Sequence, residues 1–446
     1  MQATARQAAL IRRTFIDFQQ TAEFLENPLI VDRAEGLYYW DTEGKRYFDA
    51  IGGIFVCVLG HRHPRLVAAM RAQMDKITFA PSLHGIATTT LDFIEKLGEV
   101  TPGDLKYVKP FSGGSEAVEA AFKFVRQYFR QTGHPGKYKF ISRYQSYHGG
   151  TFGGMAASGT GSRKAKFEPQ MPGFLKVFTP NHYRDQFGSW EEANRFAAQM
   201  FEDVIVGEDP ETVAGIIVEP VGNTGGIVTP TEEYFRILRR ICDRYNVMLI
   251  FDEVITGFGR TGRMFAAQTL GVTPDLICAG KGVSSGMIPM GVMIAREEMA
   301  EAFYGPPEKQ IQFAHGHTFA GNPLACAVGI AVIDEILEQG LEEKAVRLGE
   351  YLAARLSCLK KYGVVREVRG RGILRGVELV RDTRTMEPFP ELGTRLKRVA
   401  LENGLVMRVD PTWFAVAPAL IAEESDIDEL CDLIERSLRQ ALNQVS

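Results

Sequence analysis

Three short, continuously apolar segments that each lead into an ionisable residue constrain the fold of this chain most strongly. They are Val213–Glu219, Val247–Phe251 followed by Asp252, and Leu276–Ala279 followed by Gly280 and Lys281. Runs of this kind are typical of strands buried on both faces, as in a parallel sheet with helices on each side. Helical patterns accompany them at residues 115–130, 231–245 and 322–337. The alternation of strand and helix predicts an α/β fold with a mostly parallel central sheet flanked by helices.

The two ends of the chain have a different pattern. A hairpin is expected at Leu37–Trp40 and Arg46–Ala50. The C-terminal part mixes helical patterns with short strands, at 343–359, 392–403 and 424–442 for the helices and near 364–368, 374–379 and 414–416 for the strands. We therefore expect residues 66–335 to form a large α/β domain, and residues 1–65 and 336–446 to form together a smaller α+β domain.

Composition argues against two broad classes of protein. The 446 residues include 51 Lys and Arg against 55 Asp and Glu, a formal net charge of −4, and 45% of them are hydrophobic. This much apolar side chain offsets the entropy of ordering, which argues against an intrinsically disordered chain. Because there is neither a basic run nor a positive net charge, no nucleic-acid partner is expected.

The cytoplasm is the expected location, without a membrane span. The first residues carry positive charge but lack the apolar core and cleavage site of a secretory signal. The longest uncharged stretch, residues 315–333, contains two histidines, Asn322 and Pro323, which favours a buried loop and helix. The six cysteines have no paired spacing and are expected to be reduced core residues.

The ionisable residues at the strand ends are the first candidates for chemistry. Ligands of open α/β sheets bind beyond the carboxyl ends of the strands, where Glu219, Asp252 and Lys281 are expected. Burying such charges is unfavourable unless they bind a ligand or each other. A structural salt bridge between the strand ends is therefore the alternative to a binding role. A partly desolvated lysine has a lowered pKa and is a candidate Schiff-base nucleophile.

Two upstream motifs add an anion site and an aromatic ring. Gly113, Gly114 and Ser115 precede a clear helix, whose free N–H groups and dipole attract an anion. An ordinary serine cap is the alternative for this motif. Tyr147, in the sequence YHGG, follows an expected strand and is either a ligand-contacting ring or one more buried tyrosine.

Three other patterns suggest different chemistry. Residues 257–262 match the GxGxxG pattern of dinucleotide-binding proteins, but two acidic residues precede them and no acid follows about 20 residues later. Residues 282–286 match the GxSxG of serine hydrolases, but the following residues resemble a turn into a strand. The pairs His61/His63 and His315/His317 have no accompanying acidic or cysteine ligands, so no metal site is expected.

Lysine, aspartate, aromatic ring and anion site together suit one cofactor, pyridoxal phosphate. Its aldehyde forms a Schiff base with lysine, its ring nitrogen pairs with an acid, and its phosphate needs an anion site. The chain has 45 glycines, and those at 113–114, 149–150, 257, 259, 262, 280 and 282 are expected to form the rim of the cofactor pocket.

The sequences LIFDEVITGFGRTG, AGKG, HTFAGNP, FSGGSEAVEAA and SYHGG closely resemble those of class III aminotransferases, which are fold-type-I pyridoxal-phosphate enzymes. The resemblance extends over essentially the whole chain. It implies that Lys281 is the Schiff-base lysine and proton shuttle, and that Asp252 pairs with the pyridine nitrogen. It also implies that Val254 packs on one ring face and Tyr147 on the other.

The same resemblance implies a phosphate site and a quaternary structure. Gly114 and Ser115 would hold the phosphate, together with Thr318 from the neighbouring subunit, and Glu219 would lie near the phenolic oxygen. The protein would be a homodimer, or a dimer of dimers, with active sites at the interface. Its partners would be a small-molecule amine or amino acid and a keto acid, which react in a ping-pong cycle.

Four positions resemble the ω-amino acid/amine:pyruvate transaminases within this family. Ile255 stands where ornithine and 4-aminobutyrate enzymes usually have Gln, and Ala415 stands where they tend to have Arg. Arg408 matches an arginine that binds the keto-acid carboxylate, and a surface salt bridge is its alternative role. Phe55 aligns with an aromatic that shapes the substrate pocket, although a lone Phe is equally suited to a core.

We therefore expect an aminotransferase that uses an ω-amino acid or amine as donor and pyruvate or another α-keto acid as acceptor. Racemases and decarboxylases of class III share the lysine, the aspartate and the phosphate site, so they are the alternatives on the same fold. An NAD-dependent dehydrogenase that uses residues 257–262 is the alternative of another enzyme class. A catalytically silent binding protein is the non-enzymatic alternative, against which the intact Lys281 and Asp252 argue.

Overall fold

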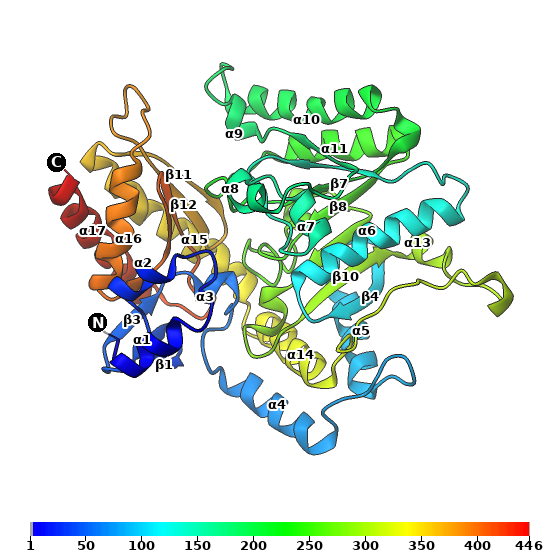
Figure 1. The fold of residues 1–446 in the computed structure, drawn as a ribbon, viewed down its shortest axis with the longest axis horizontal. Coiled ribbons are helices and arrows are strands. Elements are labelled where there is room, and N and C mark those ends of the chain that lie inside the picture. Colours follow the sequence, from blue (N-terminus) through cyan, green and yellow to red (C-terminus); the bar gives the residue numbers. More distant parts are fainter. Residues whose placement is uncertain (1–2, 446) are drawn as a thin grey trace.

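A seven-stranded sheet forms the centre of the larger group of elements (Figure 1), in a computed structural model that describes residues 3–445. The strand order is β4-β10-β9-β8-β7-β5-β6. The strands are β4 (Leu105–Phe111), β5 (Lys139–Arg143), β6 (Phe174–Val177), β7 (Val213–Val218), β8 (Met248–Asp252), β9 (Leu276–Ala279) and β10 (Gly291–Arg296). The five strands from β9 to β6 are parallel, and β10 is antiparallel to both of its neighbours. The predicted fold class is confirmed, with one antiparallel insertion.

The central strands are apolar throughout because both faces of the sheet are covered. Every residue of β7, β8 and β9 is buried. Ile216 and Leu249 belong to one hydrophobic cluster, whereas their neighbours Ile217 and Ile250 belong to another. Helix α6 (Gly114–Gln131) lines the second cluster, and α10 (Trp190–Gly207) and α11 (Glu232–Tyr245) line the first. The continuous apolar runs thus reflect helices on both sides.

Two four-stranded sheets are built from the ends of the chain. One has the order β1-β2-β3-β13 and the other β11-β12-β15-β14. Their strands are β1 (Val31–Glu35), β2 (Tyr38–Asp41), β3 (Arg46–Asp49), β11 (Val365–Arg371), β12 (Leu374–Leu379), β13 (Leu405–Val406), β14 (Arg408–Asp410) and β15 (Trp413–Val416). β13 pairs with β3 in parallel, so a segment near the C-terminus completes the N-terminal sheet.

The long C-terminal helices cover these smaller sheets, and Figure 1 shows α16 and α17 on the side opposite to α6 and α13. The helices of this part are α14 (Pro323–Glu338), α15 (Leu341–Ser357), α16 (Pro390–Glu402) and α17 (Glu424–Val445). The Asn322 side chain accepts hydrogen bonds from the first amides of α14, which confirms the start predicted from the sequence Asn-Pro. α14 packs against α4 (Pro64–Lys76) and α5 (Thr88–Val100).

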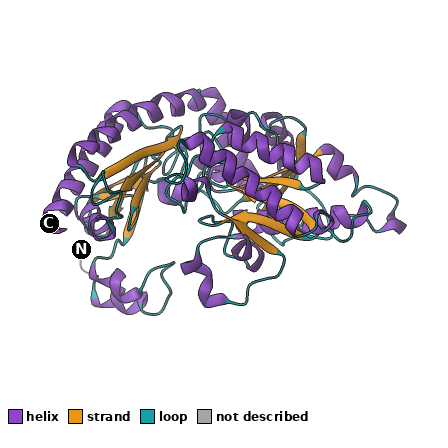
Figure 2. Ribbon diagram, turned by 90° about the horizontal axis from the view of Figure 1, so that it is seen from above, coloured by secondary structure: helices purple, strands orange, loops and turns teal. Residues whose placement is uncertain are grey.

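The remaining helices are short. They are α1 (Ala5–Ile11), α2 (Thr21–Glu26), α3 (Gly52–Phe55), α7 (Phe152–Ala157), α8 (Gly161–Lys164), α9 (Pro180–Tyr183), α12 (Ala266–Leu270) and α13 (Glu297–Glu301), with 3₁₀ turns at 165–167, 210–212, Lys281–Ser284, 307–309 and 358–362. Figure 2 shows the strands in separate groups, each bordered by helices. No helix within residues 3–445 is long and apolar enough to cross a membrane.

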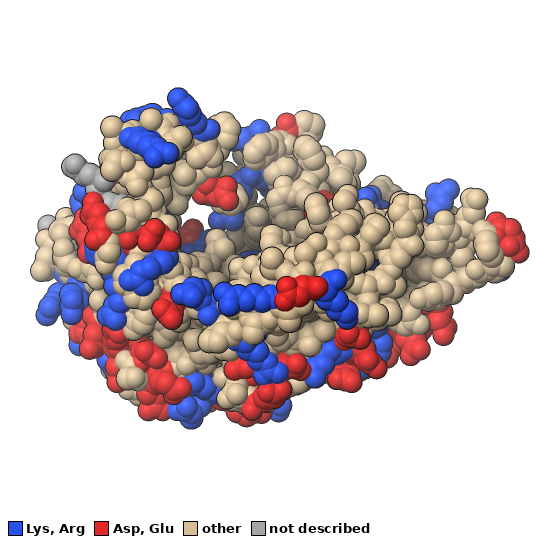
Figure 3. All heavy atoms as spheres, turned by 90° about the horizontal axis from the view of Figure 1, so that it is seen from below, with Lys and Arg blue, Asp and Glu red and all other residues tan. Residues whose placement is uncertain are grey.

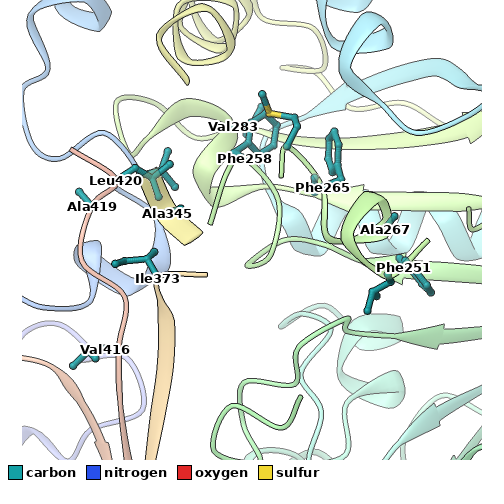
Figure 4. Close-up of a cluster of buried hydrophobic side chains, with 14 of the residues drawn as sticks. Phe251, Phe258, Phe265, Ala267, Val283, Ala345, Ile373, Val416, Ala419 and Leu420 are labelled. Atoms are coloured by element: carbon teal, nitrogen blue, oxygen red, sulfur yellow. The ribbon is translucent and has the colours of Figure 1, made fainter. Parts of the chain in front are cut away.

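The turn at residues 257–262 joins the two halves of the core. A Cβ on Gly259 would lie 2.8 Å from Leu420, and one on Gly262 would lie 2.4 Å from Val346 of α15. Figure 4 shows that this core runs from Phe258 and Val283 to Ala345 and Leu420. Gly259 and Gly262 therefore face the C-terminal elements. The expectation that they form the rim of a cofactor pocket was wrong, and no helix begins there to bind a dinucleotide.

Charged side chains of both signs are interspersed over the surface. On the face in Figure 3, Lys and Arg atoms alternate with Asp and Glu atoms along the lower part, and neither sign forms a broad continuous area. Many of these side chains are paired, as in the contacts of Arg65 with Glu335 and Glu338. Ion pairs at the surface contribute roughly 0–1 kcal/mol each, so we assign the fold's stability to the buried clusters.

Candidate active site

A cavity of about 180 Å³ lies beyond the carboxyl ends of β7, β8 and β9. The three ionisable residues predicted at these strand ends all line it. Its lining consists of Gly114, Ser115, Tyr147, His148, Gly149, Glu219, Val221, Asn223, Asp252, Val254, Ile255 and Lys281. Seven of the ten predicted site residues line this cavity, whereas Phe55, Thr318 and Arg408 do not; the seven are Gly114, Ser115, Tyr147, Glu219, Asp252, Val254 and Lys281.

Lys281 projects into the cavity from a tight turn. It opens the 3₁₀ turn Lys281–Ser284 directly after β9 and Gly280, with a left-handed φ of 45°. A non-glycine residue in this region stores strain, which is common at functional sites. Burial lowers the pKa of Lys281 to about 8, against the opposing charges of Asp252 and Glu219. Within residues 3–445 its amine makes no hydrogen bond or ion pair, so it is free to act as a nucleophile toward a ligand.

Asp252 is held at the end of β8 by two contacts. Its Oδ2 lies 2.8 Å from His148 Nδ1, and its Oδ1 accepts a hydrogen bond from the Val254 amide at 3.1 Å. Asp252 is 5% exposed, and the His148 side chain is fully buried. The His148 amide donates to Ser158 Oγ at 2.8 Å, which fixes the backbone beside the ring. The carboxylate is thus oriented toward the cavity by its surroundings.

The N-terminus of α6 forms the anion-binding part of the cavity. Gly113 is the N-cap and provides no side-chain cap, so N–H groups of the first turn are available to a ligand. A Cβ on Gly114 would lie 2.8 Å from Val254, and one on Gly149 would lie 2.8 Å from Ser115 Oγ. Gly149 also has a φ of +134°, which side-chain-bearing residues rarely adopt. These two glycines keep the backbone close to the place where an anion would bind.

Glu219 lies in a buried polar group at the end of β7. The pKa of its carboxyl is raised by burial, against the charges of His148 and Arg143. Arg143 Nη2 donates to the Glu219 carbonyl oxygen at 2.6 Å and lies 3.9 Å from Oε2. Glu219 Oε2, His148 Nε2 and Asn223 Oδ1 are buried without a hydrogen-bond partner. Buried polar atoms of this kind indicate that a polar ligand belongs here.

Tyr147 borders the cavity beside an unpredicted arginine. Burial raises the pKa of the Tyr147 hydroxyl. The Arg163 guanidinium lies 5.2 Å from the centre of the Tyr147 ring and 4.5 Å from that of Phe18. The pKa of Arg163 is lowered by burial and by the charge of Arg408. The two positive charges therefore repel each other near the cavity, and an anionic ligand would reduce this repulsion.

Arg408 and Ala415 are directly opposite each other on adjacent strands. Arg408 of β14 pairs with Ala415 of β15, and the small side chain of Ala415 is buried. Arg408 Nε donates to Asp410 Oδ2 at 3.0 Å, and its guanidinium lies 4.9 Å from the centre of the Trp413 ring. The charge of Arg408 also acts on Lys281. Arg408 is thus within electrostatic range of the cavity, although it does not line it.

Phe55 and Thr318 lie outside the cavity in different ways. Phe55 is 1% exposed and belongs to a cluster with Val221, against which Ile255 packs. Since Val221 and Ile255 line the cavity, Phe55 supports its wall from behind. Thr318 is exposed on the loop that precedes α14. No group of three or more His, Cys, Asp or Glu side chains within residues 3–445 is arranged to hold a metal ion.

Sequence reasoning missed His148, Asn223 and Arg163. His148 stands in the motif SYHGG, but only its neighbour Tyr147 was singled out there. The His148–Asp252 contact joins residues 104 positions apart, so no local pattern predicts it. Asn223 lies in a bend after β7 and Arg163 lies in the short helix α8, and neither stands in a distinctive motif. Their roles become visible only when the chain is folded.

Comparison with known proteins gives consistent matches over nearly the whole chain. A family model described as "Aminotransferase class-III" matches residues 21–438. A Mycobacterium tuberculosis protein named "Probable aminotransferase Rv3329" is 39% identical over 441 residues, covering 97% of this chain and 93% of its own length. A putrescine–pyruvate aminotransferase of Pseudomonas aeruginosa is 33% identical over 437 residues, with coverages of 96% and 93%.

A solved structure has the same fold throughout. The (S)-enantioselective omega-transaminase of Thermomicrobium roseum matches with a TM-score of 0.93 and 34% identity, covering 99% of this chain and 100% of that one.

Proposed function

Because the chain belongs to the class-III aminotransferases, which use pyridoxal phosphate, we propose that it transfers an amino group from an ω-amino acid or amine to pyruvate or another α-keto acid. We propose a ping-pong order, in which the carbonyl product of the amine donor leaves before the keto acid binds. The names of two relatives support this choice of substrates, since one is a putrescine–pyruvate aminotransferase and another is an omega-transaminase.

The cavity residues fit pyridoxal phosphate in three respects. Lys281 has an unpaired amine, as covalent attachment to an aldehyde requires. The start of α6 has no side-chain cap, and Gly114 and Gly149 let the backbone pack closely around it, which suits a phosphate. Glu219 Oε2 and His148 Nε2 are buried polar atoms in need of a partner. When bound, the cofactor supplies a carbonyl carbon that takes up the amino group and a ring that withdraws electrons from the substrate carbon.

We assign the central roles to Lys281 and Asp252. Lys281 would hold the cofactor and, once released by the incoming amine, move the proton from the substrate carbon. Its lowered pKa of about 8 leaves a useful fraction of the amine neutral near physiological pH. Asp252, held by His148, would keep the ring nitrogen protonated. The cavity that brings Lys281 and Asp252 together is the observation that carries the proposal.

The remaining predicted residues would position the cofactor. Val254 and Tyr147 would contact opposite faces of its ring, and Glu219 would lie near its phenolic oxygen. Gly114 and Ser115 would bind the phosphate. We further propose a homodimer in which Thr318 of the second subunit completes the phosphate site. Its exposure within one chain is compatible with such a role.

Arg408 and Phe55 would determine which substrates bind. Arg408 would exchange Asp410 for the carboxylate of the keto acid, with which a guanidinium forms two parallel hydrogen bonds. When the substrate is an uncharged amine, the Arg408–Asp410 contact would be kept. Phe55 would set the width of the substrate pocket through Val221 and Ile255. The absence of an arginine at position 415 leaves Arg408 as the carboxylate-binding residue of this proposal.

We also propose the domain division 1–65 with 336–446 and 66–335, which the pairing of β3 with β13 supports. A cytoplasmic location is proposed as well. The support for it is that the six cysteines have no paired spacing in the sequence, and five of them are buried.

Visible spectroscopy of the purified protein with pyridoxal phosphate tests the proposed reaction. We expect an absorption band of the lysine-bound cofactor that disappears when an amine donor is added and returns with pyruvate. Sodium borohydride should fix the cofactor's mass on Lys281, and Lys281→Ala should show neither the band nor the added mass. An amine that is racemised or decarboxylated without loss of the band would contradict aminotransfer and favour the alternatives on the same fold.

A further inference from the structure

A cysteine, a histidine and an aspartate are linked in series outside the cavity. Cys57 Sγ lies 3.7 Å from His61 Nδ1, and His61 Nε2 lies 2.8 Å from Asp49 Oδ2. Asp49 is in turn fixed by the amides of Ile51 and Gly53, which donate to its two oxygens at 3.2 and 2.6 Å. This sequence of contacts is the one by which a histidine activates a thiol in cysteine-dependent enzymes.

Two cationic side chains, His61 and Arg260, interact with Cys57. Burial acts to lower the pKa of His61, but its hydrogen bonds to Asp49 and Cys57 outweigh this and raise the pKa to about 9. His61 is therefore an imidazolium at neutral pH. Arg260 is fully buried, its Nε and Nη2 lack partners, and the charges of Cys57 and Asp49 act on it. The Cys57 sulfur therefore contacts a charged imidazole and lies within electrostatic range of a buried guanidinium that has free N–H groups.

Cys57 is connected to the segment that carries Lys281. The Leu59 amide donates to Ser285 Oγ at 2.9 Å, which links the two turns. A Cβ on Gly286 would lie 2.8 Å from Cys57 Sγ, so the sulfur has no spare room on that side. Cys57 also lies two residues after Phe55, whose φ of 65° is left-handed. Added volume on the sulfur would therefore displace one or both of these turns.

We propose that Cys57 is a peroxide-reactive thiol whose oxidation to a sulfenic acid disables the neighbouring active site. The thiolate sulfur attacks one oxygen of a hydroperoxide, so that an S–O bond forms while the O–O bond breaks. The sulfur gives up two electrons and the peroxide is reduced. The departing hydroxide takes the proton of the His61 imidazolium and leaves as water. A small thiol such as dithiothreitol reverses the change.

The other cysteines provide internal comparisons. Burial raises the pKa of the Cys242, Cys278, Cys326 and Cys431 thiols, which makes them poor nucleophiles. Cys358 is exposed, and within residues 3–445 its Sγ makes a hydrogen bond with the Ala354 carbonyl and none with a histidine. Accessibility alone thus predicts oxidation of Cys358, whereas activation by a neighbouring cation predicts oxidation of Cys57.

Mapping of sulfenic acid in the native protein separates these two predictions. The holoenzyme is treated with a small excess of hydrogen peroxide, quenched into denaturant that contains dimedone, and analysed by peptide mass spectrometry. We expect Cys57 to be labelled about tenfold faster than Cys358. Equal or faster labelling of Cys358 would overturn the proposal. This measurement does not depend on aminotransfer, so it remains valid if the proposed function fails.

Three variants test the mechanism and its consequence. His61→Gln should slow the labelling of Cys57 by about tenfold, and an unchanged rate would refute activation by His61. Cys57→Ser should keep the untreated activity and resist peroxide, whereas Cys358→Ser should lose activity to peroxide as the parent protein does. The activity readout rests on the proposed function. Oxidised Cys57 with unchanged turnover would contradict the link to the active site.

Discussion

His148 Nδ1 lies 2.8 Å from Asp252 Oδ2, and both side chains are buried. A buried carboxylate needs such a partner, because removing it from water without one is costly. The second carboxylate oxygen is held by the Val254 amide. The direction in which Asp252 faces the cavity is therefore set by residues from two different loops, one after β5 and one after β8.

Removal of the His148 ring should lower the rate of turnover, while Lys281 remains in place to bind the cofactor. We expect His148→Ala to reduce kcat by about tenfold to hundredfold, as is typical for groups that orient a ligand-binding side chain. His148→Asn keeps an N–H donor where Nδ1 lies and should recover most of the loss. Steady-state kinetics with the absorbance of the bound cofactor measures both effects. Equal loss in the two variants would indicate a role for the ring other than holding Asp252.

Substitution of Gly149 should weaken cofactor binding. In Gly149→Ala the new methyl group would lie 2.8 Å from Ser115 Oγ at a φ of +134°. Strain of this kind costs about 1–3 kcal/mol, which corresponds to an increase of about fivefold to 150-fold in the Kd of pyridoxal phosphate. Gly150→Ala is the matched control, since its Cβ would lie 3.8 Å from Tyr147 Oη. Titration of the apoprotein with cofactor should find the control unchanged.

Loss of the Arg408 charge should affect only the acidic substrate. Arg408→Met should raise the KM for pyruvate by about tenfold to hundredfold, because hydrogen bonds to charged groups contribute about 1.5–3 kcal/mol. The KM for an uncharged amine should stay within about twofold. Arg384→Met is the matched control, because Arg384 likewise pairs with an aspartate two residues away but is exposed. A parallel rise in both KM values would contradict the assigned role.

Attachment of the cofactor should depend on pH through Lys281. Only the neutral amine attacks an aldehyde, so protonation below the pKa slows the reaction. Since burial lowers the pKa of Lys281 to about 8, the rate of cofactor uptake by apoprotein should rise with pH and level off above about 8. Stopped-flow absorbance from pH 6 to 10 measures this midpoint. A midpoint close to 10.5, the pKa of an ordinary lysine, would show that the cavity does not alter the pKa of the amine.

The parts of the fold that were predictable are those encoded by neighbouring residues. Periodicity predicts the apolar strands β7, β8 and β9 and the helices between them. Because buried strands exclude charged side chains, the ionisable residues are predicted to lie at the strand ends. The start of α14 follows from Asn322 and Pro323. These local signals were sufficient to place Lys281, Asp252 and Glu219 in one cavity.

The parts that could not be predicted depend on contacts between distant segments. The antiparallel insertion of β10 is a property of strand order, which periodicity does not encode. The role of Gly259 and Gly262 was misread because a glycine-rich turn has the same sequence pattern whether it faces a ligand or a hydrophobic core. The contact of Cys57 with His61 is local, but its meaning depends on Asp49 and Arg260, which other turns bring near.

The pairing of β13 with β3 has a consequence for synthesis of the chain on the ribosome. Lys45, which precedes β3, donates to the carbonyl of Leu401, 356 positions later. β3 therefore leaves the ribosome early, whereas its parallel neighbour β13 is synthesised only after most of the polypeptide has been made. During that interval the edge of the N-terminal sheet has unpaired backbone groups, which attract other strands. Nascent chains that stall before residue 405 should thus need chaperone protection, whereas the finished chain closes this edge with its own backbone.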